Sequence, residues 1–139
     1  MKKLLTTLTI LIPMIATCQI VPINFKDCKT DQMFVSADTE PKWNCDSIGM
    51  VDFMNKFIEE RNIEKIEEGK ILIGILIYPD GKTCCYSFVN LTETILDAEK
   101  FKDIVNKMPN WTSAKQNGKG ITYLKQQFFL IRNGKFTQN

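Results

Sequence analysis

The segment that most constrains the fold runs from Lys70 to Asn90 and reads KILIGILIYPDGKTCCYSFVN. Its first half, Ile71 to Tyr78, is apolar at every position except Gly74. Because successive side chains of a strand point to opposite faces, such a strand is apolar on both faces. It must be covered on both sides or lie at the centre of its sheet. Pro79-Asp80-Gly81 forms the turn, since Gly81 can adopt a positive φ angle. The segment therefore predicts a β-hairpin with a central first strand.

Two amphipathic helices flank this hairpin in the sequence. Apolar residues recur at three- and four-residue spacing over about 47–62 and again over about 96–108. Asn44 or Asp46 can cap the first helix, and Pro109 ends the second because the residue before a proline avoids the helical region. A third strand, Ile121 to Ile131, follows. The order α-β-β-α-β predicts an α+β fold in which two helices cover a three-stranded antiparallel sheet, with strand 121–131 at its edge.

The first 18 residues have the pattern of an export signal. Lys2 and Lys3 precede the apolar run Leu4 to Ile15, which is too short for a stable membrane span, and small residues follow. Cleavage after Cys18 is favoured, with a lipobox in which Cys18 is lipidated as the alternative. We expect an exported protein that is periplasmic or secreted. If Cys18 is lipidated instead, the protein is an outer-membrane lipoprotein and contacts the membrane. Residues 19–43 then form an extended lead-in, and 44–139 form the domain.

Four cysteines remain after such a leader: Cys28, Cys45, Cys84 and Cys85. An even number in an exported protein predicts a disulfide. Cys28 and Cys45 are the expected pair because both lie in the irregular N-terminal part. Cys84 and Cys85 are adjacent in a strand and face opposite sides, so they should not bridge each other. One is expected in the core and the other at the surface.

The composition excludes several functions. The chain of 139 residues has no histidine, which removes Ser-His-Asp and Cys-His catalysis and every histidine-ligated metal site. Its formal charge of +2 is too small for a nucleic-acid footprint. The acidic residues lack the ligand spacing of an EF-hand calcium loop. We expect a protein that is not an enzyme and that uses no cofactor or metal.

Several motifs resemble the C-terminal domain of TonB. The similarity covers about residues 35–131 and includes EPKWNCDSIGMVDFMNKFIEERNI, GKILIGILIYPDGK, LDAEKFKDIVNKMPNWTSAKQNGK and ITYLKQQFFLI, in the family's order. The most specific part is a Met-Pro-x-Trp motif followed by Asn-Gly-Lys. The matching marker residues are Gly69, Asp80, Gly81, Met108, Pro109, Trp111, Asn117 and Gly118. Trp111 is expected to cap the end of the core, burying area worth roughly 2–3 kcal/mol, rather than to bind a ligand.

The chain also departs from this family. Cys45 and Asp46 replace a common Gly-Gly pair, and the Tyr-Pro pair that usually follows the first helix is missing. An energy transducer needs an N-terminal membrane anchor and a long Pro-rich linker, and the sequence predicts neither of them. The resemblance therefore implies a binding module and not an energy transducer.

The resemblance implies a binding site at the edge of the sheet. The family domain binds an extended receptor segment by strand addition, in which an unpaired edge offers regularly spaced amides and carbonyls. The expected partner-binding residues are Ile121, Tyr123, Lys125, Gln127 and Phe129. The partner is an outer-membrane receptor segment or a second copy of the chain. Alternatively, the edge is covered by residues 20–36 or by the C-terminal tail.

Two other functions remain open at the level of sequence. One is a secreted inhibitor or immunity-type protein that occupies a partner's surface. The other is a redox-active thiol protein that uses Cys84 or Cys85. No histidine or positive cluster beside these cysteines lowers a thiol pKa, and Lys82 is the nearest cation.

Overall fold

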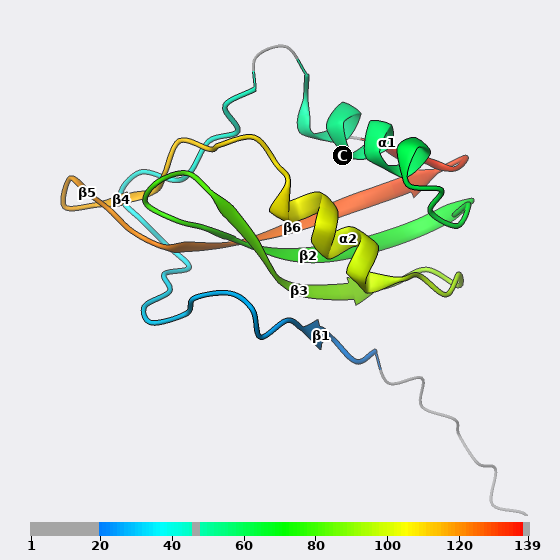
Figure 1. The fold of residues 1–139 in the computed structure, drawn as a ribbon, viewed down its shortest axis with the longest axis horizontal. Coiled ribbons are helices and arrows are strands. Elements are labelled where there is room, and N and C mark those ends of the chain that lie inside the picture. Colours follow the sequence, from blue (N-terminus) through cyan, green and yellow to red (C-terminus); the bar gives the residue numbers. More distant parts are fainter. Residues whose placement is uncertain (1–19, 46–47, 138–139) are drawn as a thin grey trace, which may run out of the picture.

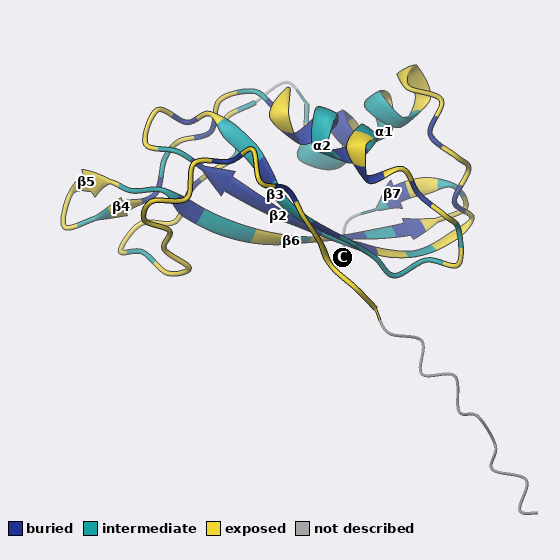
Figure 2. Ribbon diagram, turned by 60° about the horizontal axis from the view of Figure 1, so that its bottom comes forward, coloured by how far each residue is buried: buried dark blue, intermediate teal, exposed yellow. Residues whose placement is uncertain are grey.

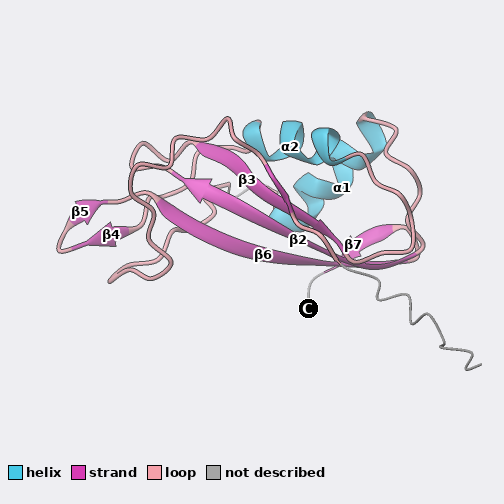
Figure 3. Cartoon of the chain, turned by 90° about the horizontal axis from the view of Figure 1, so that it is seen from below, coloured by secondary structure: helices cyan, strands magenta, loops and turns pink. Residues whose placement is uncertain are grey.

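The fold consists of a layer of two helices on one face of an antiparallel sheet, as the computed structural model shows (Figure 1, Figure 3). The structure describes residues 20–45 and 48–137. The expected export signal and Cys18 lie outside the described residues, as does Asp46. The α+β class and the helices on a single face agree with the prediction from the sequence.

β2 (Glu68–Ile77) is the central strand of the main sheet, as predicted. It pairs with β3 (Thr83–Asn90) on one side and with β6 (Tyr123–Arg132) over ten residue pairs on the other. β1 (Ile23–Asn24) lies outside β3, and β7 (Lys135–Thr137) lies outside β6. β4 (Lys115–Gln116) and β5 (Lys119–Gly120) form a separate ribbon that projects from one end (Figure 1).

The predicted number of three strands is therefore wrong. The observed order of elements contains additional short strands that the predicted order α-β-β-α-β lacks. The main sheet has five strands, ordered β1-β3-β2-β6-β7, beside a ribbon of two. β1 and β7 contain two and three residues, too few for an alternating pattern to be visible. For β7 the sequence does contain a signal, because Asn-Gly is the pair that two-residue hairpin turns favour. In the structure Asn133 and Gly134 adopt the φ angles of such a turn, 51° and 75°.

Both helices occur where predicted, but they are shorter. α1 spans Met50–Glu60 and begins after Gly49, which provides no side-chain cap. α2 spans Ala98–Asn106, and the Asp97 carboxylate accepts the Glu99 N–H at 3.0 Å. The predicted starts at residues 47 and 96 were too early, since both helices begin two or three residues later. α2 also ends two residues before Met108, because Pro109 follows.

The core lies between the helices and the near face of the sheet. Four β2 side chains on this face are fully buried: Ile71, Ile73, Ile75 and Ile77. Phe88 of β3 stacks on Phe101 of α2 at 4.8 Å between ring centroids. Buried residues follow β2 and the inward sides of both helices (Figure 2). Burial of the isoleucine stripe therefore fixes which face of β2 the helices cover.

Trp111 closes one end of this core. Its side chain is 4% exposed, and its ring meets that of Trp43 edge-on at 5.4 Å. The backbone N–H of Trp111 donates to the carbonyl of Gly81 at 2.9 Å. Gly81 has a φ angle of 82°, and a Cβ there would lie 2.3 Å from the Trp111 carbonyl oxygen. The hairpin turn and the Trp111 loop therefore require each other, and Trp111 lies in the core as expected.

Replacing Trp111 with alanine should lower the free energy of unfolding by about 3–5 kcal/mol, because it removes a buried ring from a packed core. Phe128→Ala is the control, since Phe128 is 51% exposed and its loss should cost less than about 1 kcal/mol. Urea denaturation of the two variants measures the difference. Equal destabilisation would contradict a core role for Trp111.

Candidate functional site: the outer edge of β6

Described residues cover the outer edge of β6 at both ends, and none of them pairs with its middle. At one end Phe34 forms a parallel bridge with Tyr123. At the other end β7 pairs with Leu130, Ile131 and Arg132. Residues 125–129 lie between these two contacts. We call this stretch the gap.

The direction of the backbone groups in the gap follows from its two ends. Leu124 donates its N–H outward to the Phe34 carbonyl at 2.8 Å. The Leu130 carbonyl also faces outward, where it accepts the Thr137 hydroxyl at 3.4 Å. Backbone groups alternate between the two sides of a strand. The N–H and C=O groups of Gln126 and Phe128 therefore face away from β2.

Side chains cover part of the remaining edge. Asn55 of α1 accepts the Phe136 N–H at 2.8 Å and donates to the Phe136 carbonyl at 3.1 Å, which satisfies the outer side of β7. The Gln127 amide donates to the Phe128 carbonyl at 3.0 Å. Among the described residues, the N–H and C=O of Gln126 and the N–H of Phe128 have no hydrogen-bond partner. These three groups form the candidate site.

The residues predicted for partner binding lie close to this site, but most face elsewhere. Ile121 precedes β6, while Tyr123 and Phe129 are buried, at 6% and 2% exposed. Lys125 and Gln127 are half-buried in the gap, and their backbone groups face β2. Strand 121–131 is also not a free edge along its whole length. The lead-in and the tail each cover one end, as the alternative anticipated.

The sequence analysis missed Gln126 and Phe128. Phe128 and Phe129 are adjacent apolar residues, so the pattern alone cannot tell which of them faces the helices. The Asn133-Gly134 turn could have decided it. In a two-residue hairpin, Arg132 and every second residue before it direct their backbone groups toward the returning strand. Counting back from Arg132 reaches Leu130, Phe128 and Gln126.

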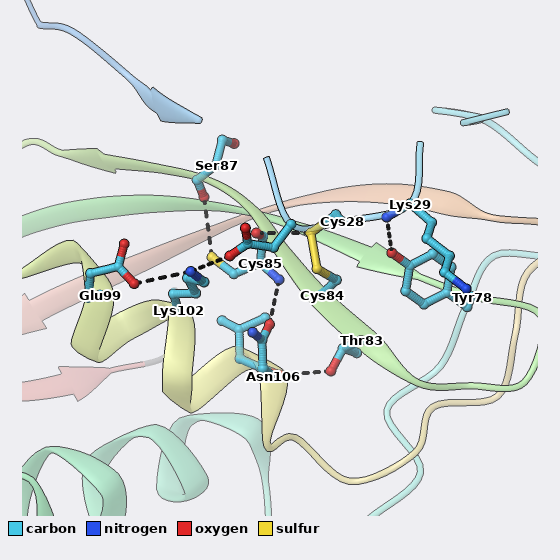
Figure 4. Close-up of a disulfide and its surroundings, with 12 residues drawn as sticks. Cys28, Lys29, Tyr78, Thr83, Cys84, Cys85, Ser87, Glu99, Lys102 and Asn106 are labelled. Atoms are coloured by element: carbon cyan, nitrogen blue, oxygen red, sulfur yellow. Dashed lines mark hydrogen bonds and ion pairs between the residues drawn. A yellow bond between two sulfur atoms is a disulfide. The ribbon is translucent and has the colours of Figure 1, made fainter. Parts of the chain in front are cut away.

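A disulfide anchors the lead-in segment (residues 20–43) that covers one end of the gap. It joins Cys28 to Cys84, whose Cα atoms lie 5.8 Å apart (Figure 4). The predicted pair Cys28–Cys45 is therefore wrong. Lead-in residues lie along β3, where Phe25 donates its N–H to the Tyr86 carbonyl at 2.9 Å, and this places Cys28 beside Cys84. Sequence separation gave no sign of this contact.

Cys85 is a core residue, fully buried on the helix side of β3. Its backbone N–H donates to the Asn106 side chain of α2 at 2.8 Å (Figure 4). Burial raises the pKa of the Cys85 thiol to about 12, although the nearby Lys102 ammonium acts in the opposite direction. A thiol of this kind carries very little thiolate at neutral pH, and thiolate is the reactive form. This environment weighs against a redox function for Cys85.

The described part of the chain contains no group of three or more His, Cys, Asp or Glu residues that could hold a metal ion. It also contains no helix long and apolar enough to cross a membrane. Comparison of the chain with protein-family models, curated proteins and solved structures gives no match. The function must therefore be argued from the gap itself.

Removing the disulfide with the double substitution Cys28→Ala and Cys84→Ala should lower the free energy of unfolding by about 4 kcal/mol, because the bond closes a long loop in the unfolded chain. In this variant the Leu124 amide should exchange faster than the Ile73 amide, because Leu124 needs only local release of the lead-in whereas Ile73, in the core strand, needs global unfolding. Hydrogen-exchange NMR distinguishes the two amides. Unchanged protection at Leu124 would show that Phe34 stays in place without the disulfide.

The buried thiol predicts a pH dependence of stability. An unfolded cysteine ionises near pH 8.5, whereas the folded state keeps the Cys85 proton up to about pH 12. The folded state thus binds more protons in this range, and the free energy of unfolding should fall as the pH rises from about 8 to about 10. The decline should be smaller in Cys85→Ala. Parallel declines in urea denaturation would contradict the assignment.

Proposed function

We propose that this chain is a non-enzymatic, exported protein–protein interaction module that binds an extended partner segment by strand addition in the gap. The observation that carries the proposal is the set of three unpaired backbone groups at Gln126 and Phe128. No described residue pairs with them, and they face away from β2 on a strand that described residues cover at both ends. An extended segment would satisfy them in the manner of an added strand.

The rest of the edge supports this proposal. Proteins usually cover or interrupt exposed strand edges, because an open edge pairs with other chains. Here Phe34, β7 and Asn55 cover the neighbouring positions. The open stretch is thus confined to 125–129, on a rigid strand that pairs with β2 along its full length. A confined opening of this kind favours a specific partner over general self-association.

The likeness to the TonB C-terminal domain supplies the proposed context. Helix, hairpin, helix and long strand follow each other in the same order, and Trp111 of the Met-Pro-x-Trp motif is part of the core. The leader pattern of residues 1–18 adds export to the proposal. Together they point to a cell-envelope partner, such as a segment of an outer-membrane receptor. A secreted inhibitor would use the same surface against a different target.

Gln126→Pro should abolish partner binding in a protein that still folds. Proline removes the outward N–H of residue 126, which takes no part in the pairing with β2, and edge positions tolerate proline. Gln126→Ala is the matched control, because it keeps that N–H and removes the side chain. Peptides that bind the original chain, with its disulfide formed, are first selected from a displayed peptide library. The binding of these peptides to the two variants is then compared.

Loss of binding in Gln126→Pro, retention in Gln126→Ala and native circular dichroism in both would support strand addition. NMR shift changes on peptide binding should then centre on the Gln126 and Phe128 amides. Equal binding by both variants would show that selected peptides bind elsewhere, and the proposal would be wrong.

A further inference from the structure

The face of the main sheet that points away from the helices is covered at one end. Both helices lie on the opposite face (Figure 3). Near the hairpin turn the lead-in segment crosses the uncovered side: Cys28 is bonded to Cys84, and the Lys29 N–H donates to the Tyr78 hydroxyl at 2.9 Å. Leu76, which points to this side, is fully buried. The lead-in therefore closes the end of the face that lies next to the turn.

Toward the other end of β2 the same face is accessible. Its apolar side chains come from three neighbouring strands, since Leu72 of β2 pairs with Val89 of β3 and with Phe128 of β6. Phe128 is 51% exposed, whereas its aliphatic neighbours are half-buried. Three exposed cations of β2, β6 and β7 border them on the same face. We call these seven side chains the open face: Leu72, Val89, Phe128, Leu130, Lys70, Arg132 and Lys135.

The cations of the open face have no carboxylate partner among the described residues. Lys70, Arg132 and Lys135 form no ion pair with any of them. Glu68 is the one carboxylate that the described strands direct to this face, and it lines a recess at the end of the sheet with Glu93. Arg132 lies directly opposite Lys135 in the β6–β7 hairpin, and like charges in that position lower stability. An anion bound on this side would offset their repulsion.

The helix layer has the opposite charge balance. α1 and α2 together carry five carboxylates and three lysines, and each of these lysines pairs with a carboxylate. The open face is therefore net positive and the helix layer net negative. A molecule with this asymmetry turns its open face toward a negatively charged surface. A second copy is disfavoured as the occupant, because two positive faces repel each other.

The start of the described chain lies on the same side of the sheet. Ile20 and Val21 are exposed apolar residues that precede β1. Because β1 runs antiparallel to β3 with Ile23 opposite Phe88, the residues before Ile23 extend toward Val89. Cys18, the residue that carries the lipid in the lipoprotein alternative, comes just before them in the sequence. A lipid attached there would hold the open face near the membrane.

We propose that the open face docks on an anionic phospholipid membrane. Lys70, Arg132 and Lys135 contact lipid phosphates, and the Phe128 ring enters the boundary between headgroups and acyl chains. Three cations and one ring give a reversible contact, in contrast to an inserted helix. Because the contact uses the face of the sheet and not its edge, it is independent of strand addition in the gap.

Co-sedimentation with lipid vesicles tests the contact. The exported chain is used with its disulfide formed and with Cys18→Ala, so that no acyl chain is attached. It should bind vesicles of equal parts phosphatidylglycerol and phosphatidylcholine, but not vesicles of phosphatidylcholine alone. Sodium chloride at about 0.5 M should release it, because salt screens the attraction between cations and phosphates. Equal binding to both kinds of vesicle, or no binding to either, would overturn the proposal.

The triple substitution Lys70→Gln, Arg132→Gln and Lys135→Gln should lower the partition coefficient at least about tenfold, because each cation near the surface adds to the attraction. The matched control neutralises three exposed lysines in or beside the β4–β5 ribbon and causes the same change in net charge. It should lower the partition coefficient less than about threefold, since those lysines lie far from the lipid. Its substitutions are Lys42→Gln, Lys115→Gln and Lys119→Gln. Equal losses in two natively folded variants would contradict docking through the open face.

Tryptophan at position 128 reports whether this side chain meets the lipid. The emission of Phe128→Trp should move to shorter wavelength when phosphatidylglycerol vesicles are added, because the indole leaves water. Glu59→Trp is the control, since Glu59 is exposed on α1, and its emission should not move. The same shift in both variants would show that the open face does not direct the contact. If the chain binds a poly-glutamate peptide through the same three cations but ignores the vesicles, an acidic protein is the occupant and the proposal is wrong.

Discussion

The pairing of β2 with both of its neighbours supports the rest of the structure. Among the strands that the structure describes, β2 is the only long one that pairs with two others over most of its length, and its isoleucine stripe is fully buried beneath the helices. The opposite face of β2 is closed at one end as well: Leu76 is fully buried and aligns with Cys84 and Leu124. Without this strand, β3 and β6 would have no common partner, and the helices, which also contact β3 and β7, would lose the isoleucine stripe beneath them.

The lead-in segment links this core to the edge of the sheet. Its first part pairs with β3 and is joined to it by the Cys28–Cys84 disulfide, and its middle reaches β6 through Phe34. Its last part places Trp43 against Phe53 and Trp111. One segment therefore touches both edges of the sheet and the end of the core. The open stretch of β6 begins where this segment leaves the strand.

Much of the fold could be predicted because its signals are local. The hairpin around Asp80-Gly81 and both helices follow from patterns of neighbouring residues, and the place of β2 follows from its two apolar faces. The candidate site was harder to predict. Whether Phe128 or Phe129 faces the helices depends on the register of β6, and that register is set by pairing with β2 and by the Asn133-Gly134 turn. A one-residue error moves every side chain to the opposite face.

The sequence by itself determined the two-layer α+β class, the central strand, the two helices and the loop that places Trp111, because short-range periodicity and turn chemistry specify each of these. Only the tertiary structure decided the disulfide partner of Cys28 and the cover that Phe34 provides at one end of β6. These features depend on contacts between residues far apart in the chain, and no local pattern records such contacts.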